Sequence, residues 1–419
     1  MGFQHGLSGL SAASTNLDVI GNNIANANTV GFKQSETQFS DVYANSLSGA
    51  SGNQVGIGVK IADIAQQFTQ GNITGSSNPL DMAINGDGFF RMSDNGAINY
   101  SRNGQFHVDK DGFIVNANDM NLTGFIADTN GNIIAAAPAN LSISTADLSP
   151  QSTTAFRTGF NLDSRAVVPA VIPPFLSTDP TTYTSTTSGQ IFDSLGNSHV
   201  LSLYFQKTAA NTWETYATVD GAPNVTLADL PADPAGPSVT ITFDTNGLLV
   251  TPTGLLDISV DLATIDPTLG ATSPLNFTLD IAEATQFGTN FGVNSLTQDG
   301  YSSGRIASFG VSGDGVILGN YTNGETRTLG QVILASFANP QGLAPLGDNL
   351  FAETPQSGQP LVGAPQTGTL GSIQESAVED SNVDLTTELV KMITAQRTYQ
   401  ANAKTIETQD AILQTLVNL

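Results

Sequence analysis

The chain contains no cysteine, which excludes disulfides and thiolate metal sites. Basic residues are scarce, with 13 Lys and Arg against 37 Asp and Glu and a net charge of -24 at pH 7. The simplest interpretation of this charge is solubility, and its field makes nucleic acid and membrane surfaces poor partners. No apolar run is long enough for membrane insertion, and the N-terminus lacks the basic and apolar regions of a cleaved signal peptide. Taken alone, the lack of a signal peptide predicts a cytoplasmic protein.

Catalytic and cofactor motifs are missing as well. Residues 300–304 match the G-x-S-x-G pattern of hydrolases, which requires a strand before it, a helix after it and a downstream histidine as base. The three histidines, His5, His107 and His199, all lie upstream, and the flanking residues are typical of turns. Isolated histidines predict no zinc site, and no phosphate-binding or dinucleotide-binding loop is present. We therefore predict that the protein is not an enzyme and uses no cofactor or metal.

Glycine is abundant, with 42 residues, and a recurring pattern places Asp or Asn before it and an apolar run after it. The Asp or Asn side chain accepts a backbone hydrogen bond from two residues on, and the Gly adopts a positive φ. Three copies also resemble the start of a calcium loop, but their twelfth positions hold Met120, Ala139 and Leu255 instead of Glu. We interpret the copies as hairpin turns of a mainly β protein, and they begin at Asp87, Asp109, Asp128, Asp193, Asp244 and Asp314.

Both ends of the chain carry an apolar stripe with the three-and-four spacing of a helix that packs against another helix. A candidate capping box at residues 381–384 precedes the C-terminal stripe. The stripes predict two terminal α-helices around a β-rich middle, and a self-assembly surface at the chain ends. The predicted self-assembly residues are Leu10, Ala13, Leu17, Ile20, Ile24 and Ala27 at the N-terminus and Leu385, Leu389, Met392, Tyr399, Ala403, Ile406, Leu413 and Val417 at the C-terminus.

Two interpretations of the stripes remain open. The two helices can pair with each other inside one monomer, as amphipathic helices usually do. Alternatively, they join copies of the chain. Asn22, Asn23 and Asn26 favour this second interpretation because Asn is a poor helix former, and contacts in an assembly would satisfy the clustered amides. The residues alone do not decide between the two.

Several blocks of sequence resemble the bacterial flagellar rod and hook axial proteins. The N-terminal block NLDVIGNNIANANTVGFK, residues 16–33, is similar to that family's N-terminal signature. The blocks NGDGFF, residues 85–90, and SRNGQF, residues 101–106, resemble its shared β-domain. Near the end, SNVDL, residues 381–385, and AQRTYQANAK, residues 395–404, resemble its C-terminal signature.

Three features point to the hook members of this family. The chain is longer than a distal rod protein needs. The block FDSLGNSH, residues 192–199, resembles the additional outer domain of hook members, and QDGYSSG, residues 298–304, resembles the segment where their chain returns to the inner β-domain. The least matched parts are residues 149–190 and 220–285. A distal rod or other hook-associated axial protein is the alternative within the family, and a secreted β-rich adhesin or a hydrolase is the alternative outside it.

The resemblance implies a fold that is mainly β with terminal α-helices. The N- and C-terminal helices form a coiled-coil-like core, and two β-rich domains lie in the middle, the outer one inserted into the inner one. The expected boundaries are 1–28 with 383–419 for the helical core, 29–75 with 360–382 for a connector, 76–148 with 286–359 for the inner β-domain and 149–285 for the outer β-domain.

The resemblance also implies a function. Hook members polymerise into a curved, flexible tube, a universal joint that transmits torque from the rod to the filament. The partners that it implies are further copies of the chain, rod proteins, hook–filament junction proteins, the hook cap and the flagellar type III export apparatus. Export through that apparatus without a cleaved signal peptide implies an extracellular location in the hook, in place of the cytoplasmic prediction.

Overall fold

The computed structural model describes residues 2–43, 56–144, 146–168, 174–222, 225–227 and 238–417. The chain forms two compact units. The first unit consists of Met1–Thr145, Ser308–Gly319 and Thr326–Leu419, and the second of Ala146–Ala307 and Asn320–Glu325. Because both ends of the chain belong to the first unit, the second unit is an insertion in the sequence of the first. Among the described residues, no helix has the length and apolar character needed to cross a membrane.

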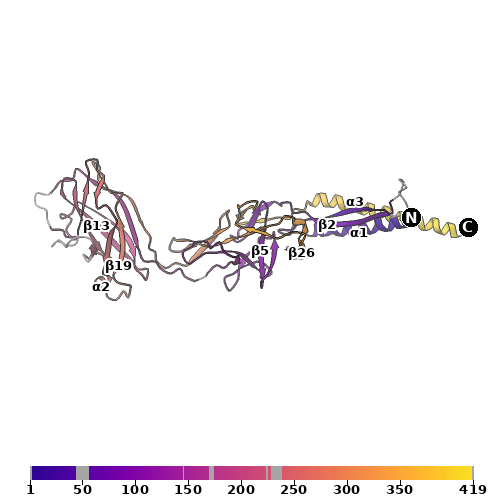
Figure 1. Ribbon diagram of the computed structural model, residues 1–419, viewed down its shortest axis with the longest axis horizontal. Coiled ribbons are helices and arrows are strands. Elements are labelled where there is room, and N and C mark those ends of the chain that lie inside the picture. The colour runs from indigo at the N-terminus through magenta and orange to yellow at the C-terminus, as the bar shows by residue number, and fades with distance from the viewer. Residues whose placement is uncertain are drawn as a thin grey trace. The chain divides into compact units, whose positions relative to one another are not determined.

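Two long helices and a β-hairpin form one part of the first unit. Helix α1 (Gly2–Ala25) packs against helix α3 (Leu385–Val417), and the antiparallel strands β1 (Ser35–Val42) and β2 (Gly58–Gln66) lie along α1. Figure 1 shows α3 and β2 running beside α1. The sequence analysis did not predict the hairpin, because β1 is mainly polar and the apolar residues of β2 do not keep a strict two-residue period.

The start of α3 differs from the prediction. The Oδ1 atom of Asp384 accepts hydrogen bonds from the backbone N–H groups of Thr386, at 2.8 Å, and Thr387, at 3.1 Å, so Asp384 is the N-cap. The predicted capping box, which began at Ser381, is therefore wrong by three positions. The Ser381 hydroxyl instead accepts from the backbone N–H of Val383, before the helix begins.

The rest of the first unit is β-structure. Its largest sheet places strands from the N-terminal third beside strands from the C-terminal quarter, and its core includes Phe89, Tyr100 and Phe351. The strands of this sheet are β5 (Phe89–Asp94), β6 (Ala97–Ser101), β7 (His107–Val108), β8 (Ile114–Val115), β9 (Asn121–Ile126), β10 (Ala139–Asn140), β22 (Ile306–Val311), β23 (Val316–Tyr321), β24 (Thr326–Val332), β25 (Leu334–Ser336), β26 (Ala344–Gly347), β27 (Leu350–Ala352) and β28 (Leu361–Gly363).

Short strand pairs and one helical turn complete the first unit. Strand β3 (Ile73–Gly75) pairs with β30 (Ala377–Glu379), and β4 (Met82–Asn85) pairs with β29 (Ser372–Glu375), both antiparallel. The 3-10 turn η1 spans Pro340–Gly342. Strands β29 and β30 come just before α3. Their pairing with β4 and β3 therefore attaches the segment before the C-terminal helix to the β-structure of the first unit.

The second unit consists of two sheets that face each other across one apolar core. One sheet has mixed directions, since β11 is parallel to β19 and β20 but antiparallel to β21, and the other is an antiparallel meander. A one-turn helix, α2 (Leu262–Ile265), is capped by Asp261. The first sheet contains β11 (Ala155–Asp163), β15 (Val225–Leu227), β18 (Leu256–Val260), β19 (Leu275–Asp280), β20 (Thr285–Phe287) and β21 (Gly292–Gln298), and the second contains β12 (Ser185–Phe192), β13 (Ser198–Ala209), β14 (Thr212–Val219), β16 (Ser238–Phe243) and β17 (Leu249–Thr251).

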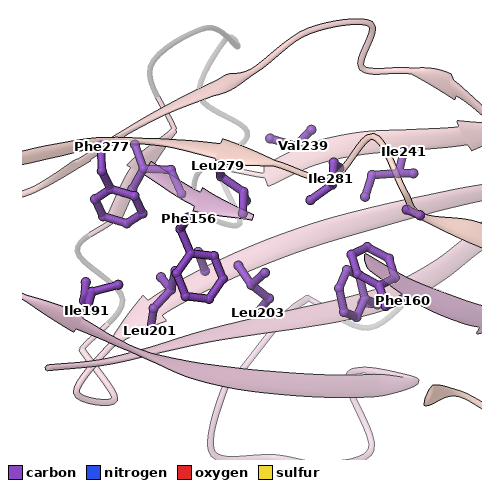
Figure 2. Close-up of a cluster of buried hydrophobic side chains, with 14 of the residues drawn as sticks. Phe156, Phe160, Ile191, Leu201, Leu203, Val239, Ile241, Phe277, Leu279 and Ile281 are labelled. Atoms are coloured by element: carbon purple, nitrogen blue, oxygen red, sulfur yellow. The ribbon is translucent and has the colours of Figure 1, made fainter. Parts of the chain in front are cut away.

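The core of the second unit follows the two-residue period of its strands. On β13 the side chains of Leu201, Leu203 and Phe205 are buried, as expected for one face of a strand. Figure 2 shows Leu201 and Leu203 in a cluster with Phe156 and Phe160, which come from the other sheet. The indole Nε1 of Trp213 is fully buried and donates to Oε1 of Gln286 at 2.9 Å, so its polar atom has a partner.

Five of the six predicted turns are confirmed. At Asp128, for example, Oδ1 accepts from the backbone N–H groups of Asn130 and Asn132, both at 2.8 Å, and Gly131 has φ +82°. The turns at Asp109, Asp193 and Asp244 repeat this pattern, and Gly315 turns the chain between β22 and β23. The prediction is wrong at Asp87, which forms an isolated bridge with Leu370 far along the chain instead of a local hairpin.

The observed fold confirms the predicted class, mainly β with terminal helices and more than one β domain. The helices pack together within one chain, as the first of the two interpretations of the stripes expects. The structure does not test the four predicted boundary sets.

Candidate assembly surface

The two terminal helices run antiparallel. Near one end of the pair, Gly6 and Gly9 of α1 approach α3 so closely that a Cβ on Gly6 would lie 2.8 Å from Cγ1 of Ile406, and one on Gly9 would lie 2.7 Å from Oδ1 of Asn402. Near the other end, Asn23 of α1 contacts Glu388 of α3. Since the early residues of α1 meet the late residues of α3, the helices point in opposite directions. A side chain at Gly6 or Gly9 would fit only if the side chain of Ile406 or Asn402 moved.

A polar contact fixes the register of the helix pair. Asn23 is 2 % exposed, and its Oδ1 accepts from the backbone N–H of Ser35 at 2.9 Å. Its Nδ2 donates to the backbone oxygen of Ser35 at 2.8 Å and to Oε2 of Glu388 at 3.1 Å. The other carboxylate oxygen of Glu388 accepts from Nζ of Lys391 at 2.8 Å. A buried amide with every group paired favours one arrangement over others, because any shift leaves polar atoms unpaired.

These contacts correct one expectation from the sequence. The clustered amides were expected to need contacts with other copies, but Asn23 finds its partners inside the chain, and Nδ2 of Asn26 donates to the backbone oxygen of Asn22 at 3.0 Å. The partners of Asn23 come from a strand that the sequence analysis did not predict. Strand β1 begins at Ser35, beside Asn23, and supplies the backbone groups that the amide requires.

The N-terminal stripe lies largely against other parts of the chain. Ala13 and Ile20 are buried, and the other four predicted residues are half-buried. Ser8, on the same helix, accepts a hydrogen bond from the backbone N–H of Val59 in β2 at 3.4 Å. Helix α1 therefore has neighbours on two sides, α3 and the hairpin. The half-buried residues of the N-terminal stripe are Leu10, Leu17, Ile24 and Ala27.

The C-terminal stripe is divided. Met392, Ala403 and Ile406 are half-buried, whereas the fully buried positions of α3 are Glu388 and Ala395, which the stripe did not include. Glu388 precedes the predicted Leu389 by one residue, which is about 100° around a helix. Much of the predicted stripe therefore faces away from α1. Its exposed members are Leu385, Leu389, Tyr399 and Leu413, with exposed fractions of 42 %, 49 %, 36 % and 54 %, and the side chain of Val417 lies outside the described residues.

A groove of about 830 Å³ lies beside the helix pair. Its lining comes from α1, from α3 and from the hairpin, and it includes Ala12, Ala13, Val59, Val390 and Thr394. Small and apolar side chains predominate, and Val390 is 60 % exposed. A concave apolar surface next to exposed apolar residues is typical of a site for protein contact.

A buried cluster of charges lies where the helices meet the β-structure of the first unit. Nζ of Lys33 contacts Oε1 of Glu379 at 2.6 Å, and NH1 of Arg102 contacts Oε2 of the same carboxylate at 3.2 Å. Oε1 of Glu379 also accepts from the backbone N–H of Gly71 at 2.9 Å, and Lys33 donates to the backbone oxygen of Thr69 at 2.7 Å. We call Lys33, Arg102 and Glu379 the ion cluster.

The cations of this cluster are held in a dry environment. Burial lowers the pKa of Lys33, Glu379 opposes that change by stabilising the ammonium, and Arg102 adds to it. Burial likewise lowers the pKa of Arg102. Removing the carboxylate would leave two buried cations without their counter-charge, which is much more costly than the loss of an exposed pair. Sequence reasoning missed this cluster, although Lys33 and Arg102 are two of only 13 basic residues.

Four protein-family models match the chain. They are described as "Flagella basal body rod protein" for residues 3–33, "Flagellar hook protein FlgE/F/G D1 domain" for 83–151, "Flagellar basal body protein FlaE D2 domain" for 161–301 and "Flagellar basal body rod FlgEFG protein C-terminal" for 374–419.

Full-length relatives decide the family. The chain is 43 % identical to the flagellar hook protein FlgE of Escherichia coli K12 and 42 % identical to that of Salmonella typhimurium LT2, with 100 % of each chain covered. It is 35 % identical to the protein of the same name from Borreliella burgdorferi, covering 99 % of this chain and 98 % of the relative. The chain belongs to the flagellar hook protein family. It is a structural subunit of the bacterial flagellar hook and serves motility.

A solved hook protein has a similar fold. The crystal structure of Helicobacter pylori flagellar hook protein FlgE2 matches with a TM-score of 0.52 over 72 % of this chain and 99 % of that one. The two chains are only 14 % identical, so this match concerns the fold alone.

The family models give the ion cluster a further meaning. Lys33 is the last residue of the N-terminal match, Arg102 lies in the D1 match and Glu379 lies in the C-terminal match. One carboxylate therefore joins three segments that the hook protein family shares. The family match narrows the search for such a site to three segments, each of which also contains other charged residues.

Proposed function

We propose that this hook subunit polymerises with copies of itself into a curved, flexible tube that acts as a universal joint and transmits torque from the rod to the filament. The main support is the exposed apolar face of α3. Leu385, Leu389, Val390 and Ile393 are each 42–60 % exposed, although each is large and apolar. Burying such a side chain contributes on the order of 1.5–3 kcal/mol before the entropy of association is subtracted.

The mechanism needs two kinds of contact. Contacts along the tube have to hold under load, and apolar helices supply them. Contacts around the tube have to rearrange as the joint turns, and polar β-surfaces supply them, since wet polar interfaces change partners at little cost in free energy. In this proposal the fourteen stripe residues contribute to the self-assembly core, including those that pack inside the chain. The exposed ones meet other copies.

We assign the parts of the tube as the sequence suggests. Residues 1–28 with 383–419 form the helical core, 29–75 with 360–382 a connector, 76–148 with 286–359 the inner β-domain and 149–285 the outer β-domain. The subunit meets rod proteins at one end of the hook and junction proteins at the other. Before it joins the tube, the subunit meets the flagellar type III export apparatus, which exports it without a cleaved signal peptide, and the hook cap. The role is structural, and we assign no catalysis to the chain.

Electron microscopy tests this function directly. Purified full-length chain, concentrated under polymerising conditions, is expected to form tubes whose length increases with protein concentration. Limited proteolysis gives a control, because a preparation whose α3 has been removed is expected to form none. A wild-type chain that stays monomeric at every concentration and salt level would contradict the proposal.

A further inference from the structure

Helix α3 extends beyond its partner. Ile406 faces Gly6 of α1, and the helices are antiparallel, so the chain past Ile406 runs toward the start of α1. Leu413 lies seven residues further, about 10 Å along the axis, whereas the described part of α1 extends only from Gly6 to Gly2, about 6 Å. The last two turns of α3, residues 411–417, are therefore not covered by α1. We call them the overhang.

The overhang continues the face that α3 turns toward α1. Leu413 follows Ile406 by two full turns and so lies on the same side of the helix. It is 54 % exposed, and its neighbour Ile412 is 50 % exposed. Residues 411–417 contain no charged side chain. Leu413 thus lies on the same face of α3 as Ile406, but α1 does not reach far enough to pack against it.

The groove beside the helix pair matches the overhang in length and chemistry. Along α1 it is lined from His5 to Ile20, about 22 Å of helix, which is enough for two turns of another helix. Its floor on α1 runs from His5 through Gly9, Ala and Asn positions to Val19 and Ile20 and carries no carboxylate or Lys or Arg. The charged residues of its walls are Glu36 of β1 and, on α3, Glu388 and Lys391, which pair with each other. Since copies that each carry a net charge of -24 repel one another, uncharged surfaces are where they can approach.

From these observations we infer that the overhang of one copy seats in the groove of a second copy. The inference rests on the proposed function and specifies the two surfaces that meet when copies assemble. The two surfaces are different, so the contact is head-to-tail. Each copy that donates its overhang still has an empty groove, and each copy that fills its groove still has a free overhang. Such a contact does not close on itself, and it produces an open helical polymer.

Single cysteines test the contact, because the chain contains none of its own. One chain carries Leu413→Cys in the overhang, and a second carries Thr394→Cys in the wall of the groove. The control replaces Thr394→Cys by Gln396→Cys, which is also exposed and on the same helix but outside the groove lining. Equal amounts of the overhang chain and one partner are polymerised, oxidised and digested, and disulfide-linked peptides are measured by mass spectrometry.

The expected result is a linked peptide pair between positions 413 and 394 at least about tenfold more abundant than the pair between 413 and 396. Equal yields in preparations that contain tubes would overturn the inference while leaving the proposed function intact. Absence of tubes from the wild-type chain would instead remove the proposed function, and the inference with it.

A bulky residue in the groove supplies a second measurement that does not depend on cysteine chemistry. Thr394→Trp fills the groove at an exposed position, so the monomer should melt as the wild type does. The concentration needed for polymerisation is expected to rise at least about tenfold, while Gln396→Trp changes it less than twofold. An equal effect of both variants would overturn the inference.

Discussion

The second unit and the helix pair of the first unit differ in how far their large apolar side chains are exposed. In the second unit two sheets close over Phe160, Phe205 and Trp213, none of which is exposed to solvent. On α3, large apolar residues such as Leu389 and Leu413 are about half-exposed. The second unit completes its core within one chain. The helix pair has its register fixed by Asn23 but leaves an apolar face exposed, as expected for a subunit whose packing is completed by other copies.

The largest expected effect comes from a charge on the open face. Leu413→Asp places a carboxylate in a contact that we propose to be buried between copies, at an expected cost of several kcal/mol per contact. Because a polymer repeats this cost at every subunit, tubes should be absent by electron microscopy. Since Leu413 is exposed in the single chain, the melting temperature of the monomer should not change. Tubes of wild-type length would show that the end of α3 is not part of the core.

A cavity in the core of the second unit should destabilise the monomer, whereas Leu413→Asp should affect assembly alone. Trp213→Ala removes a fully buried ring that donates to Gln286, and it should lower the free energy of unfolding of the second unit by about 3–5 kcal/mol. Thermal unfolding followed by calorimetry would measure this, with the exposed Ser188→Ala as a control. A shift below about 1 kcal/mol would mean that the two sheets do not depend on each other as the structure indicates.

The ion cluster links the open region to the β-structure of the first unit. Glu379→Gln keeps the shape of the side chain but leaves Lys33 and Arg102 without their counter-charge, so the first unit should lose about 3 kcal/mol of stability. Denaturant unfolding followed by far-ultraviolet circular dichroism reports on the helices. Glu407→Gln, in the exposed pair with Lys404, is the matched control and should leave unfolding unchanged. Equal unfolding of both variants would contradict a structural role for the cluster.

The smallest effect concerns alkaline pH. Burial, together with Glu353, which accepts a hydrogen bond from the hydroxyl, raises the pKa of Tyr100 to about 12. The raised value means that the folded state holds the proton more tightly than the unfolded chain, with its ordinary value of about 10. This contribution, on the order of 2 kcal/mol, is complete below pH 10 and is lost between pH 10 and 12. Tyr100→Phe should flatten the pH dependence of stability in that window, and an unchanged slope would contradict the assignment.

The sequence predicted local features well and long-range ones poorly. The turns at Asp128 and Asp193 could be predicted because each is made by residues within five positions of each other. The face of α3 was predicted one residue off, because Leu389 is more apolar than Glu388. In the structure, Glu388 is buried and pairs with Asn23 of α1, and this contact cannot be read from the periodicity of α3.

Other features were beyond the reach of the sequence. In the hairpin β1–β2, β1 is mainly polar, and the apolar residues of β2 change from odd to even positions between Ile61 and Ile64, so neither strand alternates throughout as a half-buried strand does. The ion cluster joins Lys33 to a carboxylate 346 positions later, and no local pattern records that pairing. Only the resemblance to a known family brought these distant segments together, and it did so without indicating which charges meet.

The contacts between the two ends of the chain also bear on the order of folding. Asn23 and Glu388 are 365 positions apart, and closing a flexible loop of that length costs on the order of 5 kcal/mol in chain entropy. The hairpins of the β-structure close loops of only a few residues and so form first. As they form, they shorten the free chain between the ends. We therefore expect the helix pair to be the last element to form, so that its adhesive face is complete only on a chain whose β-structure is already folded.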